Sequence, residues 1–119
     1  MYRIIIAGGR DFNDYELLKK EVSGFLKTLD IDNGLEIVSG GAKGVDAMGE
    51  RFANENDVAV KLFPAEWSKY GRGAGPKRNR QMSEYATHLI AFWNGESKGT
   101  RSIITLAKKY DLNVTVISV

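Results

Sequence analysis

The sequence contains no cysteine and only one histidine, His88, among its 119 residues. The absence of cysteine excludes disulfides and thiolate metal sites, and a single histidine cannot form a multi-histidine metal cluster. No apolar run approaches the ~20 residues that a membrane span requires, and the N-terminus shows no signal-peptide pattern. We therefore expect a cytoplasmic protein with no membrane partner, no metal and no cofactor.

The composition that remains is that of an ordinary globular protein, with 43% hydrophobic and 27% charged residues. A chain of this length forms one domain, residues 1–119, and is long enough to bury a core. The formal net charge of +2 is too small to indicate a nucleic-acid partner by itself.

Short apolar segments alternate with segments of helical periodicity along the whole chain. The first, from Arg3 to Ala7, is apolar on both faces, which is typical of a parallel sheet covered on both sides. Asn13 is expected to cap the first helix and Pro76 to open the third. Right-handed crossovers then predict an α/β fold: a single Rossmann-like three-layer domain with a five-stranded parallel sheet and four helices. The expected strands are 3–7, 35–38, 58–63, 89–93 and 114–119, and the helices cover about 14–29, 45–56, 76–85 and 100–110.

Every segment that follows a strand is rich in glycine and charge, whereas the segments that lead back from helix to strand are short. The rich segments are residues 8–11, 39–46, 64–78 and 94–100. In sheets of this type, ligands bind outside the carboxyl ends of the strands. The asymmetry therefore predicts a binding site at that edge.

The stretch from Ser39 to Asp46, SGGAKGVD, joins an apolar strand to a helix. Its three glycines permit positive φ and let backbone N–H groups converge on an anion, and the helix adds the positive end of its dipole. Its spacing matches neither the P-loop nor the dinucleotide fingerprint. It is either a phosphate-binding turn or a tight turn without a ligand, and we favour phosphate.

Four charged residues at this edge each have two interpretations. Arg10 and Asp11 either hold a phosphate and a ribose hydroxyl or form a local ion pair, and we favour the site. Lys43 either reaches the phosphate or is solvated. Asp46 either binds the ligand or lies in the first turn of its helix only because the helix dipole stabilises a carboxylate there. Arg78 shares a helix face with apolar residues, so we expect it to face the ligand.

A second glycine-rich turn, residues 94–100, offers further N–H groups and a hydroxyl. Trp93 before it is either a stacking wall or part of the core. The basic segment from Lys69 to Arg80, which also holds aromatic residues, is either a mobile lid or a solvated loop. The candidate ligand-binding residues are Gly8, Gly9, Arg10, Asp11, Ser39, Gly40, Gly41, Lys43, Gly44, Asp46, Arg78, Asn79, Asn94, Gly95, Lys98, Gly99 and Thr100.

Four motifs together resemble the SLOG superfamily, which joins the DprA/Smf DNA-processing proteins to the Lonely Guy nucleotide hydrolases. They are IIAGGRDF (5–12), SGGAKGVD (39–46), GPKRNRQM (75–82) and FWNGESKGT (92–100). Within the superfamily, the chain is most similar to the YspA/cpYpsA-related SLOG family. The resemblance implies a Rossmann-like fold that binds nucleotides or their derivatives, often as a homodimer.

The resemblance to the hydrolases breaks at their last motif, Pro-Gly-Gly-x-Gly-Thr-x-x-Glu, where Ile103 replaces the catalytic glutamate. Cleavage of an N-glycosidic bond requires a carboxylate, which Glu96, Asp46 or Asp11 would have to supply. We therefore expect a protein that binds an ADP-ribose-like or cyclic nucleotide ligand for sensing or sequestration. The alternatives are a hydrolase of nucleoside 5′-monophosphates that uses Arg78, and a DprA-like DNA-binding module.

Overall fold

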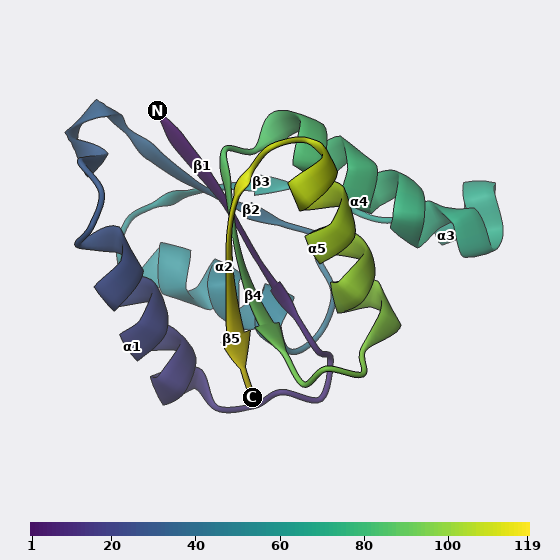
Figure 1. The fold of residues 1–119 in the computed structure, drawn as a ribbon, viewed down its shortest axis with the longest axis horizontal. Coiled ribbons are helices and arrows are strands. Elements are labelled where there is room, and N and C mark those ends of the chain that lie inside the picture. Colours follow the sequence, from purple (N-terminus) through teal and green to yellow (C-terminus); the bar gives the residue numbers. More distant parts are fainter.

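All five expected strands pair in one parallel sheet, in the order β3-β2-β1-β4-β5 (Figure 1). In this computed structural model, which describes residues 1–119, the central strand β1 has β2 and β4 as its neighbours. The chain therefore runs outward from β1 in one direction and then returns to continue in the other. The strands are β1 (Tyr2–Gly8), β2 (Leu35–Ser39), β3 (Ala59–Leu62), β4 (His88–Trp93) and β5 (Asn113–Ser118).

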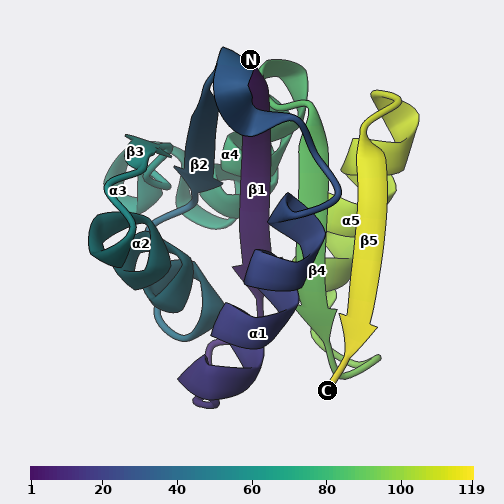
Figure 2. The same cartoon turned by 90° about the vertical axis from the view of Figure 1, so that its left-hand side faces the viewer.

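Four long helices cover the two faces of the sheet and confirm the predicted three-layer α/β fold (Figure 2). The helices α1 (Tyr15–Leu26) and α2 (Val45–Glu55) pack on one face. The helices α4 (Ala74–Tyr85) and α5 (Lys98–Lys109) pack on the other. No helix combines the length and the apolar character needed to cross a membrane.

The apolar run in β1 forms the centre of both cores. Ile4 and Ile6 belong to the core under α1 and α2, whereas Ile5 belongs to the core under α4 and α5, and all three are fully buried. Alternate residues of a strand point to opposite faces, so a strand buried on both sides must be apolar at every position. This explains why the run of three isoleucines predicted a covered parallel strand.

The structure differs from the sequence-based predictions at two helix starts. The cap of α1 is Asp14, whose carboxylate accepts a hydrogen bond from the N–H of Leu17 at 3.1 Å, so the prediction of Asn13 was wrong by one residue. The helix α4 begins at Ala74, and Pro76 lies in its first turn, where a missing N–H removes no intrahelical bond. The expected loop before it also contains the one-turn helix α3 (Trp67–Tyr70).

The carboxyl end of β1 has no room for a side chain at Gly8. A Cβ there would lie 2.5 Å from the carbonyl oxygen of Phe92 and 2.6 Å from a methyl group of Val45. We predict that Gly8→Ala lowers the free energy of unfolding by about 1–3 kcal/mol, because β4 or α2 must move. Urea unfolding at equilibrium measures this change.

The matched control for this substitution is Gly24→Ala, in the interior of α1, where nothing lies within 4 Å of the added Cβ. This variant should gain about 0.5–1 kcal/mol, because alanine loses less backbone entropy than glycine in a helix. If both variants shifted the unfolding midpoint in the same direction, the close approach at Gly8 would be refuted.

Candidate functional site

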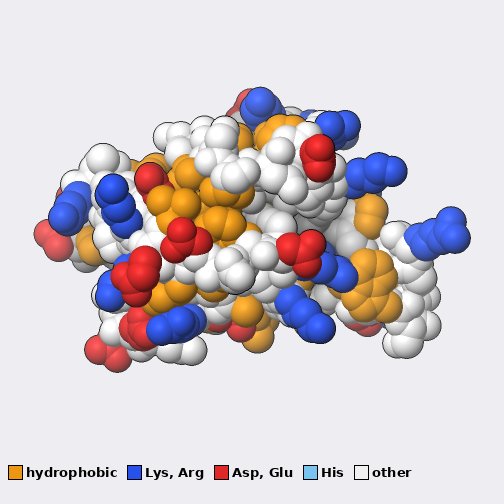
Figure 3. Space-filling view, turned by 90° about the horizontal axis from the view of Figure 1, so that it is seen from below, with side chains coloured by type: hydrophobic (Ala, Val, Ile, Leu, Met, Phe, Trp, Pro, Cys, Tyr) orange, Lys and Arg blue, Asp and Glu red, His pale blue; other side chains and the backbone are white.

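A cleft of about 760 Å³ opens at the carboxyl ends of β1 and β4, where the strand order reverses. Its walls come from the segment after β1, the turn before α2, the start of α4, the turn after β4 and the start of α5. Figure 3 looks onto this edge of the sheet, which carries both acidic and basic side chains. The cleft lies where open α/β sheets bind their ligands, as the loop asymmetry predicted.

The turn before α2 is held tightly against the end of β1. The N–H of Val45 donates to the carbonyl of Gly9 at 3.3 Å. Gly44 has a φ of 74°, and a Cβ there would lie 2.3 Å from that same carbonyl oxygen. Only glycine fits this position, because the backbone conformation is left-handed and there is no space for a side chain.

Two of the amides in this turn are already bound by side chains of the protein. Gly41 donates to the hydroxyl of Ser39 at 3.1 Å, and Ala42 donates to the carboxylate of Asp46 at 3.3 Å. The N–H groups without an acceptor in this turn are therefore those of Gly40, Lys43 and Gly44, not the whole set that the glycines suggested.

Arg78, on α4, connects that helix to the same turn. Its Nη1 donates to the carbonyl of Gly40 at 2.6 Å, and its Nε donates to the side chain of Asn79 at 2.9 Å. Burial lowers the pKa of Arg78, while the nearby carboxylate of Asp46 opposes this effect. Arg78 thus presents a half-buried guanidinium, held by two hydrogen bonds, to the cleft.

Asp46 is a buried carboxyl group in the wall of the cleft, with only 6% of its surface exposed. Burial raises its pKa from 3.8 to about 6, although the Ala42 N–H and the charges of Arg78 and Arg10 act in the opposite direction. An anion bound beside it would raise the pKa further, because a negative neighbour favours the protonated form.

The turn after β4 is organised by two polar side chains. The carboxamide of Asn94 accepts hydrogen bonds from the N–H groups of Glu96 and Ser97, at 2.8 and 2.9 Å. The hydroxyl of Ser97 caps α5 by accepting from the N–H of Thr100 at 3.4 Å. The amides of Lys98 and Gly99 have no acceptor within the protein, so the first turn of α5 offers free donors beside the cleft.

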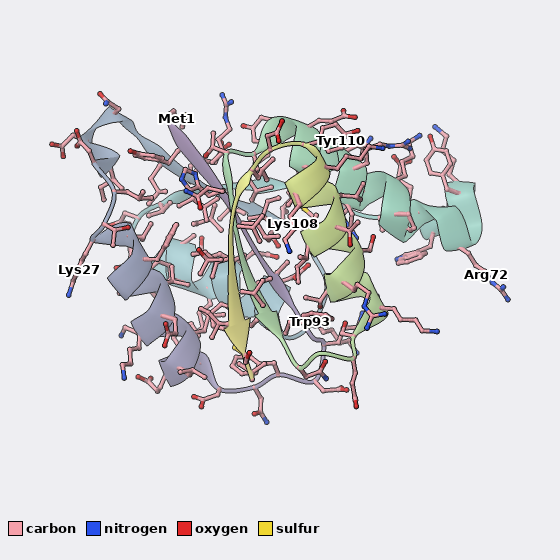
Figure 4. All side chains as sticks on the ribbon, viewed as in Figure 1. Met1, Lys27, Arg72, Trp93, Lys108 and Tyr110 are labelled. Carbon is pink, nitrogen blue, oxygen red and sulfur yellow. The ribbon has the colours of Figure 1, made fainter.

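Trp93 supports this turn from behind. Its indole N–H donates to the carbonyl of Ser97 at 3.1 Å, and its ring does not line the cleft. Figure 4 places it at the end of β4, next to the start of α5. Of its two interpretations, packing within the fold is the one that these contacts support.

The structure brings most of the candidate residues to the cleft, but not all. The exceptions support the walls from outside or face elsewhere: Ser39, Gly40, Gly41, Lys43, Gly44, Gly95 and Lys98. Lys98 faces a separate groove between α4 and α5. The candidates that line the cleft are Gly8, Gly9, Arg10, Asp11, Asp46, Arg78, Asn79, Asn94, Gly99 and Thr100.

Sequence reasoning missed the apolar wall of the cleft. Phe12 and Phe92 lie with ring centroids 5.7 Å apart, and Met82 of α4 also lines the cavity. The available signal was Phe12 itself, an aromatic residue directly after the charged pair Arg10-Asp11 in an otherwise polar segment. Phe92 and Met82 are almost fully buried, so the half-buried Phe12 supplies most of the apolar surface that these three residues offer to the cleft.

The fold is that of a Rossmann-like domain, and the cleft lies at the switch point of its sheet. The chain belongs to the YspA, cpYpsA-related SLOG family, whose model matches residues 2–70. Gene 61 protein of Mycobacterium phage D29 is 31% identical over 120 residues, which cover 96% of this chain and 94% of the phage protein. The resemblance stated from the motifs is thereby confirmed.

Two solved structures share the fold at low sequence identity. DNA processing protein A (DprA) from Streptococcus pneumoniae has a TM-score of 0.76 and 19% identity, over 99% of this chain and 50% of that one. DprA from Helicobacter pylori, solved to show its single-stranded DNA binding mode, has a TM-score of 0.72 and 20% identity over 97% and 64% of the two chains. This chain thus spans less than two thirds of either DprA chain.

The raised pKa of Asp46 predicts how stability depends on pH. Because the folded protein holds this proton more tightly than the unfolded chain, stability from this group is present below pH 3.8 and is lost as the pH rises to about 6. The asparagine variant Asp46→Asn has no such titration, so its stability relative to wild type should rise by about 2 kcal/mol from pH 4 to pH 7. Denaturant unfolding of both proteins across this range measures the difference, and parallel pH profiles would contradict it.

Proposed function

We propose that the cleft binds a nucleotide-derived ligand through its phosphate, to sense or sequester it. The ligand is of the ADP-ribose or cyclic nucleotide class. The observation that carries this proposal is that Arg10, Arg78 and the free N–H groups at the start of α5 border one cavity. Arginines and helix N-termini are the groups that proteins use most often to hold phosphate.

The same cleft also offers groups that suit the rest of a nucleotide. Asp11 and Asp46 offer carboxylate oxygens that accept hydrogen bonds from ribose hydroxyls, and the half-buried ring of Phe12, which lies against Phe92, offers apolar surface to a base. A volume of about 760 Å³ lies in the range of known small-molecule pockets. The charged and apolar groups together therefore favour a whole nucleotide over free phosphate.

The lining also argues against a long polyanion in this cavity. Three carboxylates, those of Asp11, Asp46 and Glu96, face the same space as Arg10 and Arg78. A strand of nucleic acid requires a surplus of cations, which this cavity does not have. One or two phosphates balanced by two arginines fit the charge better.

Binding of ADP-ribose to Arg10→Gln tests the proposal. Arg10 is exposed and makes no hydrogen bond within the protein, so its loss should leave the fold intact. We predict a 10–100-fold weaker affinity by calorimetry, because a charge-assisted hydrogen bond contributes about 1.5–3 kcal/mol. AMP serves as a second probe.

The matched control is Arg72→Gln, which removes the same charge from the outer end of the α3 segment, where Figure 4 shows Arg72 pointing away from the sheet. Its affinity should equal that of wild type. Equal affinities of all three proteins, or no binding of either nucleotide by wild type, would reject the proposed site.

Hydrolysis of a nucleoside 5′-monophosphate is the second candidate function, and the buried carboxyl of Asp46 is the observation that favours it. Ile103, which takes the place of the hydrolases' glutamate, lines the cleft and is 2% exposed. Because its side chain is aliphatic, it cannot act as an acid or a base, so another carboxyl group would have to do so. A carboxyl with a pKa near 6 beside a fixed arginine is suited to general acid–base chemistry.

Chromatography of AMP incubated with concentrated protein separates the two functions. Under the binding proposal, no adenine is released. Release of adenine that disappears in Asp46→Asn, while AMP affinity is kept, would replace the binding proposal with the hydrolase.

A further inference from the structure

A second hollow, of about 570 Å³, lies between α4 and α5 on the outer side of these helices. Four cationic side chains line it: Lys77 and Arg80 from α4, and Lys98 and Arg101 from α5. No carboxylate lines it. The only salt bridge in the protein, Arg51–Glu55, lies on α2, so none of the four cations is paired with an acid. We call this surface the basic groove.

The spacing of these residues explains why they meet. On each helix the two cations are three residues apart, and residues at this spacing share a face. The two faces are turned toward each other because α4 and α5 pack together, with the carboxamide of Asn79 donating to the hydroxyl of Ser102 at 3.4 Å. Four like charges in one groove repel each other, and an anion between them would relieve this repulsion.

The rest of the lining also favours an anion. Ser102 and Thr105 add hydroxyl donors, whereas Gly73 and Pro76 add no bulk at the rim. The groove thus offers cations and hydroxyl donors over the length of two helical turns of α5. This pattern suits a chain of phosphates better than a single one.

The basic groove is distinct from the cleft, although both use α5. Gly99, Thr100 and Ile103 face the cleft, whereas Lys98, Arg101 and Thr105 face the groove. The hydrogen bond from Asn79, a cleft residue, to Ser102, a groove residue, forms the wall between them. Loss of binding in one site is therefore separable from loss in the other.

Aromatic side chains lie beside the start of α4, next to the groove. The Nζ of Lys77 lies 3.7 Å from the centroid of the Tyr70 ring. Trp67 is 51% exposed, and a Cβ on Gly75 would lie 3.3 Å from its ring, which places the ring against α4 one residue before Pro76. Figure 1 shows that α3, which carries both aromatics, extends beyond the end of α4. Tyr70 is half-buried under Lys77, so Trp67 is the exposed ring beside the groove, and an exposed aromatic ring beside cations is typical of surfaces that stack unpaired bases.

We propose that the basic groove binds the phosphate backbone of a single strand of nucleic acid, with a base stacked on Trp67 of α3. A duplex keeps its bases stacked on one another and has none to offer Trp67. The groove function is independent of the nucleotide ligand proposed for the cleft.

Fluorescence anisotropy with a labelled twelve-nucleotide oligo(dT) tests the groove. The variant Arg80→Gln/Arg101→Gln keeps the aliphatic stems but removes two charges, and we expect at least a tenfold loss of affinity. The salt dependence of binding should also become shallower, by a slope of roughly 1.4 for two lost phosphate contacts. Trp67→Ala should weaken binding about fivefold or more and leave the salt slope unchanged.

The matched control is Lys20→Gln/Lys27→Gln, which removes two charges from the α1 side of the sheet, where Figure 4 shows Lys27. Its affinity for the oligonucleotide should stay within twofold of wild type, and ADP-ribose affinity should be unchanged in the groove variant. Three results would overturn the proposal. They are equal losses of affinity in the groove and control variants, absence of oligo(dT) binding by wild type, and equal competition by a duplex of the same length. Failure of ADP-ribose binding alone would refute the cleft ligand and leave the groove standing.

Discussion

The close packing of the turn before α2 on the end of β1 is the constraint on which the site depends. Gly44 lies so near the carbonyl of Gly9 that no side chain fits between them, and the N–H of Val45 bonds to that carbonyl. This contact holds Asp46 at one wall of the cleft and Arg10 at another. Since β1 and β4 are neighbours, the turn after β4 completes the cavity without any long loop.

Arg78 and Asp46 set the electrostatics of this site. Both lie against Gly40, where an added Cβ would be 2.4 Å from the guanidinium and 2.9 Å from the carboxylate. Burial acts on the two groups in opposite senses, lowering the pKa of the arginine and raising that of the aspartic acid. A phosphate bound as proposed would raise the pKa of Asp46 further, and protonation of this acid would reduce the repulsion between the two groups.

The fold could be predicted because the alternation of apolar strands and amphipathic helices is a local pattern. The three isoleucines of β1 and the glycine-rich strand exits required no knowledge of long-range contacts. The cleft was harder, because helix rotation decides which side chains enter it. Gly99 and Lys98 are adjacent in sequence, yet one lines the cleft and the other the basic groove. Likewise, the glycines of residues 40–44 predicted a ring of free amides, but Ser39 and Asp46 occupy two of them.

The segment from Lys69 to Arg80 shows a second limit of sequence reasoning. The sequence does not decide whether this basic stretch forms a lid over the cleft or a solvated loop. In the structure, most of it folds into α3 and the first turns of α4. Of its cations, Arg78 faces the cleft, whereas Lys77 and Arg80 face the groove. A helix divides its charges between faces in a way that a count of lysines and arginines does not reveal. The homodimer implied by the family resemblance stays a prediction.

The most direct test of the central claim is an amide NMR titration of the uniformly ¹⁵N-labelled protein with ADP-ribose. The account predicts that the signals of residues 9–11, of Ala42 and Asp46, and of residues 99–100 shift together along one saturating curve, because these three segments line a single cleft. Shifts confined to other surfaces, or different midpoints for the three segments, would contradict it.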